Sequence, residues 1–157
     1  MKVHTATASD FEAWIALARE VEPLFGPMAD DDSFRDAVRQ AIAGQTAFCL
    51  RQETQDRPQP LAGGIVISTD TNEIAWLAVS GANREKGCGT ALLGEALVHL
   101  NRQETAFVQT FDASVPEGQA ARRLYGRFGF ADLKKGGDNP AGLPTVIMER
   151  PATGDRT

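Results

Sequence analysis

The sequence is poor in the residues that build metal centres and disulfides. Its 157 residues include only two cysteines and two histidines. Cys49 and Cys88 do not have the spacing of metal ligands, and nothing in the sequence points to secretion. We therefore expect no bound metal and two free thiols in a cytoplasmic protein.

Long apolar runs and an excess of basic residues are absent as well. No apolar stretch approaches the roughly 20 residues that cross a bilayer, and no signal peptide is visible at the N-terminus. The formal net charge is −5, whereas proteins that bind nucleic acids usually carry a basic face. We expect neither a membrane nor a nucleic acid as a partner.

The remaining composition is that of a globular protein. Hydrophobic residues make up 42% and charged residues 24% of the chain, without internal repeats or an interior linker. The length suits one domain with its own hydrophobic core. We predict a single domain over residues 1–150 and a frayed C-terminal tail over 151–157.

Apolar periodicity predicts a chain of strands and helices. Strands are expected at 2–6, 47–51, 61–68, 73–79, 106–111 and 145–150, with a further one near 131–134. Helices are expected from Ser9 or Asp10, from about residue 33, over 90–102 and over about 117–128, separated by polar loops at 51–59, 68–72 and 134–144. Caps are expected from Ser9 with Glu12, and from Asp32 or Ser33. This order predicts an α/β (α+β) fold with a mixed sheet and helices on both faces.

The stretch NREKGCGTALLGEAL, residues 83–97, places two glycines and two cations before an apolar helical pattern. The first N–H groups of a helix lack partners within the helix, and the helix dipole adds positive charge there. Gly87 and Gly89 let bare backbone approach an anion, and Arg84 and Lys86 add charge. The segment is therefore either a phosphate-binding loop or a plain turn between a strand and a helix.

Spacing separates this loop from two familiar phosphate loops. A Walker-type loop needs lysine where Cys88 stands, and a dinucleotide-binding loop needs a third glycine where Leu92 stands. The pattern that remains is Arg84-x-x-Gly87-x-Gly89 after the apolar strand EIAWLAV. It resembles the pyrophosphate loop of the GNAT superfamily of acyl-CoA-dependent N-acetyltransferases.

A second segment, ARRLYGRFGF, strengthens this resemblance. The family pattern Ala-x-x-Leu/Phe-Tyr-x-x-x-Gly-Phe is matched at Ala121, Leu124, Tyr125, Gly129 and Phe130. The first three share one helical face, and a glycine in the position of Gly129 is typical of a helix end. The resemblance spans the chain and implies the GNAT fold, a central mixed sheet whose fourth strand is bulged and splayed from its neighbour.

The resemblance also implies the residues of the site and acetyl-CoA as the co-substrate, without a metal. Tyr125 would protonate the departing thiolate. Glu73 is the candidate general base, with Asp112 or a water chain as alternatives. The coenzyme A-binding residues that it implies are Leu77, Ala78, Val79, Arg84, Glu85, Lys86, Gly87, Cys88, Gly89, Thr90 and Tyr125.

Some positions depart from the family pattern or have two interpretations. Gly118 stands where the family often has an asparagine that supports the coenzyme arm, and Glu85 stands where glycine is frequent. Cys88 reads as a packing residue. The arginines of the second segment either approach the nucleotide or are solvated, the second being favoured: Arg122, Arg123 and Arg127.

We expect an N-acetyltransferase that moves an acetyl group directly to a primary amine of a small molecule, peptide or protein. The loop after the first helix would shape the acceptor site: Leu24, Phe25 and Met28 as an apolar wall, and the aspartates at 30–32 either as a cation site or as a helix cap, the latter favoured. The alternatives are a non-catalytic acyl-CoA sensor and a toxin that acts on aminoacyl-tRNA, which the acidic balance disfavours. Pairing of two copies into a homodimer through the C-terminal strands is compatible with the fold.

Overall fold

The computed structural model describes residues 1–153, and their seven strands form one mixed sheet in the order β1-β2-β3-β4-β5-β7-β6. The strands are β1 His4–Thr5, β2 Ala47–Arg51, β3 Leu61–Ser68, β4 Glu73–Val79, β5 Ala106–Phe111, β6 Ala131–Asp138 and β7 Pro144–Arg150. The α-helices are α1 Phe11–Phe25, α2 Asp32–Ala43, α3 Cys88–His99 and α4 Gln119–Arg127. Three single-turn 3-10 helices complete the fold: η1 Ala8–Asp10, η2 Gly81–Asn83 and η3 Pro116–Gly118.

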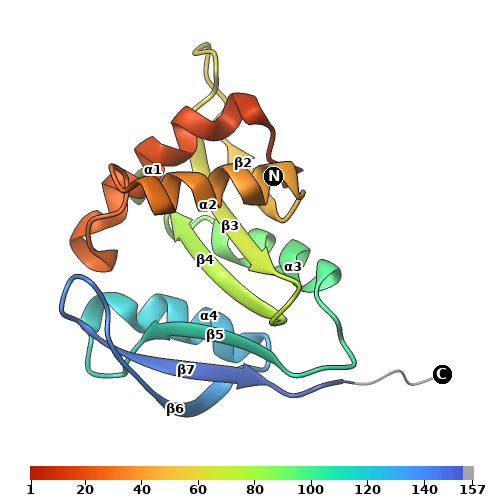
Figure 1. Ribbon diagram of the computed structural model, residues 1–157, viewed down its shortest axis with the longest axis vertical. Helices are drawn as coiled ribbons and strands as arrows, with labels where there is room; N and C mark the ends of the chain where they lie inside the picture. Colours follow the sequence, from red (N-terminus) through yellow and green to blue (C-terminus); the bar gives the residue numbers. More distant parts are fainter. Residues whose placement is uncertain (154–157) are drawn as a thin grey trace.

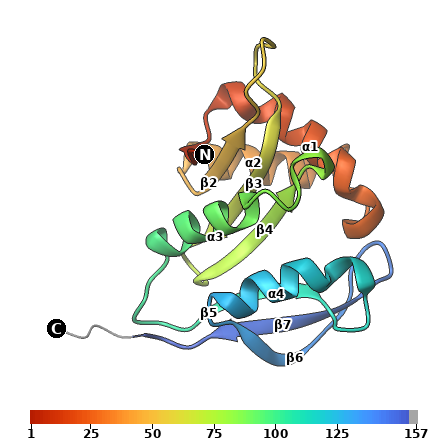
Figure 2. The same cartoon turned by 180° about the vertical axis from the view of Figure 1, so that it is seen from behind.

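The helices cover both faces of the sheet, as predicted. Helices α1 and α2 lie on one face, and α3 and α4 lie on the other (Figures 1 and 2). Each face has its own apolar cluster, with Trp14 buried in the first and Leu92 and Leu93 in the second. The predicted extra strand is also present as β6, although it extends to Asp138 through residues that the sequence assigned to a loop.

Strands β4 and β5 are joined at one end only. They pair in parallel through Glu73 with Phe107 and Ile74 with Val108, and then diverge (Figure 1). On the other side of β4, the register with β3 shifts so that Ala75 is the extra residue of a β-bulge. The predicted bulged and splayed fourth strand is therefore confirmed, and a gap opens in the middle of the sheet.

The helix caps differ from the predicted ones. Thr7, in an extended conformation, forms a capping box with Asp10 ahead of α1, so Ser9 and Glu12 are not the cap. Asp31 caps α2 by accepting a hydrogen bond from the Ser33 N–H at 2.8 Å. The shift has a simple cause at α1, because the 3-10 turn η1 precedes the helix and moves the cap upstream.

Asp10 also ties the start of α1 to β2. Its carboxylate, 3% exposed, accepts hydrogen bonds from Nε and Nη2 of Arg51 at 2.9 and 2.8 Å. Burial raises the pKa of Asp10, but the bonds from Arg51 and Thr7 outweigh it and hold the pKa below its usual value. Burial, followed by the nearby Asp10 charge, raises the pKa of Cys49 to about 12, so this cysteine stays a thiol. Both cysteines are free, as predicted.

The C-terminal segment leaves the sheet after β7. Of the predicted frayed tail, residues 154–157 lie outside the described part of the chain. Within that part, the Thr153 N–H donates to the Arg102 carbonyl at 2.9 Å. Among residues 1–153, no helix combines the length and the apolar character needed to cross a membrane.

Candidate active site

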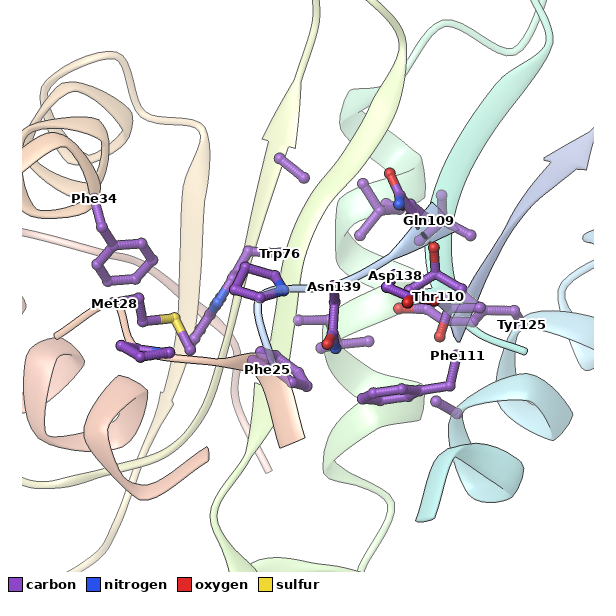
Figure 3. Close-up of a pocket in the computed structure, with 18 residues that line it drawn as sticks. Phe25, Met28, Phe34, Trp76, Gln109, Thr110, Phe111, Tyr125, Asp138 and Asn139 are labelled. Atoms are coloured by element: carbon purple, nitrogen blue, oxygen red, sulfur yellow. Dashed lines mark hydrogen bonds between the residues drawn. The ribbon is translucent and has the colours of Figure 1, made fainter. Parts of the chain in front are cut away.

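The gap between β4 and β5 forms the floor of a pocket of about 440 Å³ (Figure 3). Its walls come from both sides of the sheet, from the end of α1, from α2 and α4, and from the loop between β6 and β7. The lining residues are Phe25, Pro27, Met28, Phe34, Ile74, Ala75, Trp76, Leu77, Val108, Gln109, Thr110, Phe111, Ala121, Tyr125, Asp138, Asn139, Pro140 and Thr145.

Two main-chain N–H groups of β4 point into this gap. The Ser80 N–H donates to the Ala62 carbonyl of β3 at 2.8 Å. Because N–H groups alternate in direction along a strand, those of Leu77 and Val79 point away from β3, where β5 has diverged. Leu77 and Val79 therefore present donors that no strand satisfies, whereas the Ala78 side chain is buried under α1.

Tyr125 lies on α4 and reaches the pocket from the opposite side. It is 4% exposed and packs edge-on against Phe130 with ring centroids 5.7 Å apart. Burial alone raises the pKa of Tyr125, so its hydroxyl keeps its proton at neutral pH. The structure thus brings Leu77 and Tyr125, two of the predicted site residues, to one pocket.

The glycine-rich loop leads from β4 into α3 in a conformation that needs glycine. Gly87 is the N-cap of α3 in the left-handed region, at φ 84°, and no side chain caps this helix end. Glu85 is left-handed too, at φ 61°, a conformation that favours glycine over a residue with a side chain. Helix α3 begins at Cys88, two residues before the predicted start, so the N–H groups of Cys88, Gly89 and Thr90 form its first turn.

Most side chains of the loop are exposed and polar, whereas that of Cys88 is buried. Arg84, Glu85, Lys86 and Thr90 are exposed, and Arg84 Nε donates to the Val79 carbonyl at 3.4 Å. Cys88 is buried in the core, and burial raises its pKa. The predicted packing role of Cys88 is thereby confirmed.

At Gly118, which departs from the pattern noted in the sequence, an aromatic side chain leaves no room for a larger residue. A Cβ at Gly118 would overlap the Cβ of Phe111 and lie 2.8 Å from its Cγ. The Phe111 ring lines the pocket, so this chain fills with an aromatic side chain the room that an asparagine at 118 would need.

We expect Gly118→Asn to destabilise the fold by about 1–3 kcal/mol or more, because the new side chain collides with Phe111. Chemical denaturation measures the loss. Gly126→Ala in the same region is the matched control, since a Cβ there meets nothing within 4 Å, and helix propensity predicts a gain of about 0.5–1 kcal/mol. Equal stabilities of Gly118→Asn and the wild type would show that Phe111 moves aside freely.

The two candidate carboxylates lie away from the pocket lining. Glu73 sits at the closed end of the gap, where its Oε1 accepts a hydrogen bond from the Thr71 hydroxyl at 2.6 Å. Asp112 closes a turn by accepting from the Ser114 N–H at 2.7 Å, and hydrogen bonds from Ser114 lower its pKa. A lowered pKa makes Asp112 a weaker base than an ordinary aspartate.

The remaining predicted charges are mostly structural. Arg122 forms a bidentate pair with Asp132 at 3.0 and 3.1 Å, and Arg127 donates to the Thr90 hydroxyl at 3.4 Å, beside the start of α3. Asp30 pairs with Arg19. None of the aspartates at 30–32 lines the pocket, which supports the capping interpretation.

Sequence reasoning identified only some of the residues that line the pocket. It named Phe25 and Met28, which line the pocket, and Leu24, whose carbonyl accepts a hydrogen bond from Asn139. It did not place Phe34, Trp76 or Asp138 in the pocket, because they lie in three separate predicted segments: the second helix, the strand at 73–79 and the loop at 134–144. No signal in one sequence shows that these three segments meet.

Comparison with known proteins agrees with this geometry. A family model described as an acetyltransferase (GNAT) domain matches residues 25–150, most of the chain. The chain belongs to the GNAT acetyltransferase family. By that membership it is an acyltransferase. The curated protein sequences contain no significant match.

Solved structures share the GNAT fold over nearly the whole chain. A chain of the NatC complex bound to Gag peptide and CoA has a TM-score of 0.75 at 17% identity, covering 98% of this chain and 100% of that one. The ribosomal-protein-S18-alanine N-acetyltransferase from Escherichia coli has a TM-score of 0.71 at 17% identity, covering 99% and 96%. The PaiA N-acetyltransferase from Thermoplasma acidophilum in complex with coenzyme A has a TM-score of 0.71 at 15% identity, covering 96% and 98%.

Proposed function

We propose that this GNAT protein transfers an acetyl group from acetyl-CoA directly to the primary amine of a small molecule or peptide. The observation that carries the proposal is the open side of β4. There, the N–H groups of Leu77 and Val79 face a gap whose other wall holds the Tyr125 side chain. Paired donors beside a protonated hydroxyl are what acyl transfer from a thioester requires.

The residues around the gap fit coenzyme A. The uncapped start of α3 offers the N–H groups of residues 88–90 to the diphosphate, with Arg84, Lys86 and Arg127 at its rim. The N–H of Val79 suits the pantetheine amides, which would run along β4 as an added strand. When bound, acetyl-CoA supplies the activated acetyl group as a thioester.

The chemistry asks three things of the protein. The Leu77 N–H stabilises the carbonyl oxygen as it gains negative charge. The Tyr125 hydroxyl donates its proton to the departing sulfur. Glu73 accepts the proton of the attacking amine through intervening water, because its carboxylate lies outside the pocket lining.

The test is a pair of measurements on the purified protein. Calorimetric titration with acetyl-CoA should give saturable heat, and release of free thiol should depend on an added amine. Absence of any heat would refute the coenzyme site. If acetyl-CoA binds but no added amine causes release of free thiol from it, the result would support an acyl-CoA sensor in place of an enzyme.

Gly87→Ala should weaken coenzyme A binding about tenfold, because a non-glycine residue is strained in the left-handed region by roughly 1–2 kcal/mol. Its methyl would also stand in the open space before α3. The dissociation constant is measured by calorimetry. Gly94→Ala, in the same helix and with nothing within 4 Å of the new Cβ, is the control that should bind coenzyme A as the wild type does. If Gly87→Ala also binds like the wild type, the start of α3 is not the diphosphate site.

A further inference from the structure

The acceptor side of the pocket is divided into an apolar half and a polar half. Figure 3 shows the apolar side chains of Phe25, Met28, Phe34 and Trp76 together, on the side of α1, α2 and β4. The polar side chains come from β5 and from the end of β6: Gln109, Thr110, Asp138 and Asn139. An occupant of this pocket therefore meets an apolar surface on one side and hydrogen-bonding groups on the other.

The apolar half is built from aromatic rings in contact. Trp76 lies 6.2 Å from Phe25, 6.0 Å from Phe34 and 5.6 Å from Trp14, centroid to centroid. Within residues 1–153, the Nε1 atoms of both tryptophans are buried without a hydrogen-bond partner. Apart from these two N–H groups, the wall presents the carbon surface of its rings, and it favours an aromatic or branched aliphatic group by burial and ring contact.

Two loops meet over the acceptor end and restrict the size of the occupant. Gly26, which ends α1, packs so closely on the β6–β7 loop that a Cβ there would lie 2.8 Å from the Pro140 carbonyl carbon. Asn139 Nδ2 donates to the Leu24 carbonyl at 2.9 Å, across the same junction. Figures 1 and 2 both show this loop beside the end of α1. These contacts fix the two loops to each other and narrow the acceptor end of the pocket.

The polar half carries one carboxylate. Asp138, at the end of β6, is exposed and is the single acidic residue in the lining. The amides beside it are engaged in the fold, since Gln109 Nε2 donates to Gly136 and Thr145, and Asn139 Nδ2 to Leu24. Asp138 is therefore the group in the lining that attracts an approaching ammonium ion.

From these contacts we infer the substrate class: a small primary amine with an aromatic or large aliphatic group, which packs against Phe25, Phe34 and Trp76 while Asp138 attracts its ammonium. The inference rests on the proposed function and narrows it. We therefore expect a highly polar polyamine or an internal lysine of a folded protein to be a poorer substrate than such an amine.

Thiol release with 2-phenylethylamine, ethylamine and spermidine tests the inference on the wild type. We expect kcat/KM for 2-phenylethylamine to exceed that for ethylamine about 100-fold, because the ring is removed from water. Faster turnover of spermidine would overturn the inference and leave the proposed function intact. If none of the amines caused thiol release, both the inference and the proposed function would be contradicted. Preference for a short peptide with an apolar N-terminal residue over every free amine would overturn the assignment to a small molecule.

Single variants then test the apolar half and the polar half of the pocket separately. Phe34→Ala should lower the ratio between 2-phenylethylamine and ethylamine about tenfold, and Leu133→Ala, which removes an exposed apolar side chain outside the pocket, should leave it unchanged. Asp138→Asn should raise KM for 2-phenylethylamine and remove the salt dependence of that KM, with kcat nearly constant. An unchanged ratio in Phe34→Ala, or an unchanged KM in Asp138→Asn, would overturn the corresponding half of the assignment.

Discussion

Tyr125→Phe is expected to lower kcat about 100-fold, since the variant loses the proposed acid for the leaving thiolate. The phenyl ring keeps the edge-on contact with Phe130, so KM for acetyl-CoA and the thermal stability should change little. Thiol release under saturating acetyl-CoA measures the effect. A variant with a wild-type kcat would show that solvent protonates the sulfur.

The pH profile separates Tyr125 from another acid. Burial raises the pKa of Tyr125, so the hydroxyl holds its proton beyond about pH 10, where a free tyrosine ionises. The kcat of the wild type should therefore not decline on the alkaline side below that pH. A decline at lower pH that persists in Tyr125→Phe would assign the titration to a different group.

Arg51→Met is expected to destabilise the protein by about 3–5 kcal/mol at neutral pH, the largest effect on stability that we predict. It removes the partner of Asp10, whose side chain is 4% exposed, and leaves a buried carboxylate unpaired. Urea denaturation measures the loss. Arg102→Met, at an exposed arginine that forms no ion pair within residues 1–153, is the control and should change stability by less than about 0.5 kcal/mol.

The loss in Arg51→Met should depend on pH with a definite sign. In the wild type, the pKa of Asp10 is lowered, so its contribution is present above the unfolded pKa and is lost as pH falls through the folded one. In the variant, only the hydrogen bonds from Thr7 still oppose burial, so the pKa of Asp10 is higher than in the wild type and protonation of Asp10 costs the folded state less stability. The difference between the two proteins should shrink below about pH 4. A difference independent of pH would point to lost packing of the Arg51 side chain.

The fold was predictable where the sequence carries local signals in register. Gly87 and Gly89 stand before an apolar helical pattern, and Gly129 ends a second helix that carries Tyr125. These positions locate α3, α4 and the strand before them within a few residues. The splay of β4 followed from the family resemblance alone, because a bulge at Ala75 leaves no mark in an apolar run.

The acceptor pocket was beyond sequence reasoning for a different reason. Phe34, Trp76 and Asp138 lie far apart in the chain, and each fits its own element without reference to the others. Gly118 was recognised as a departure, but its cause is the Phe111 ring, which only the packing of α4 on β5 reveals. The cap of α1 was misplaced because the 3-10 turn η1 and the Asp10–Arg51 pair, a contact between distant segments, compete with local preference.

The packing of α3 against α4 sets the distance between the start of α3 and Tyr125 on α4. A Cβ on Gly89 would lie 3.0 Å from Leu124 Cδ2, and Leu124 immediately precedes Tyr125. In the proposed coenzyme site, the packing of α3 against α4, of which this contact is a part, would set the distance between the diphosphate and the sulfur. A bulkier residue at 89 would press on Leu124 and so change the spacing of α3 and α4 next to Tyr125, even though each anchoring point kept its own shape.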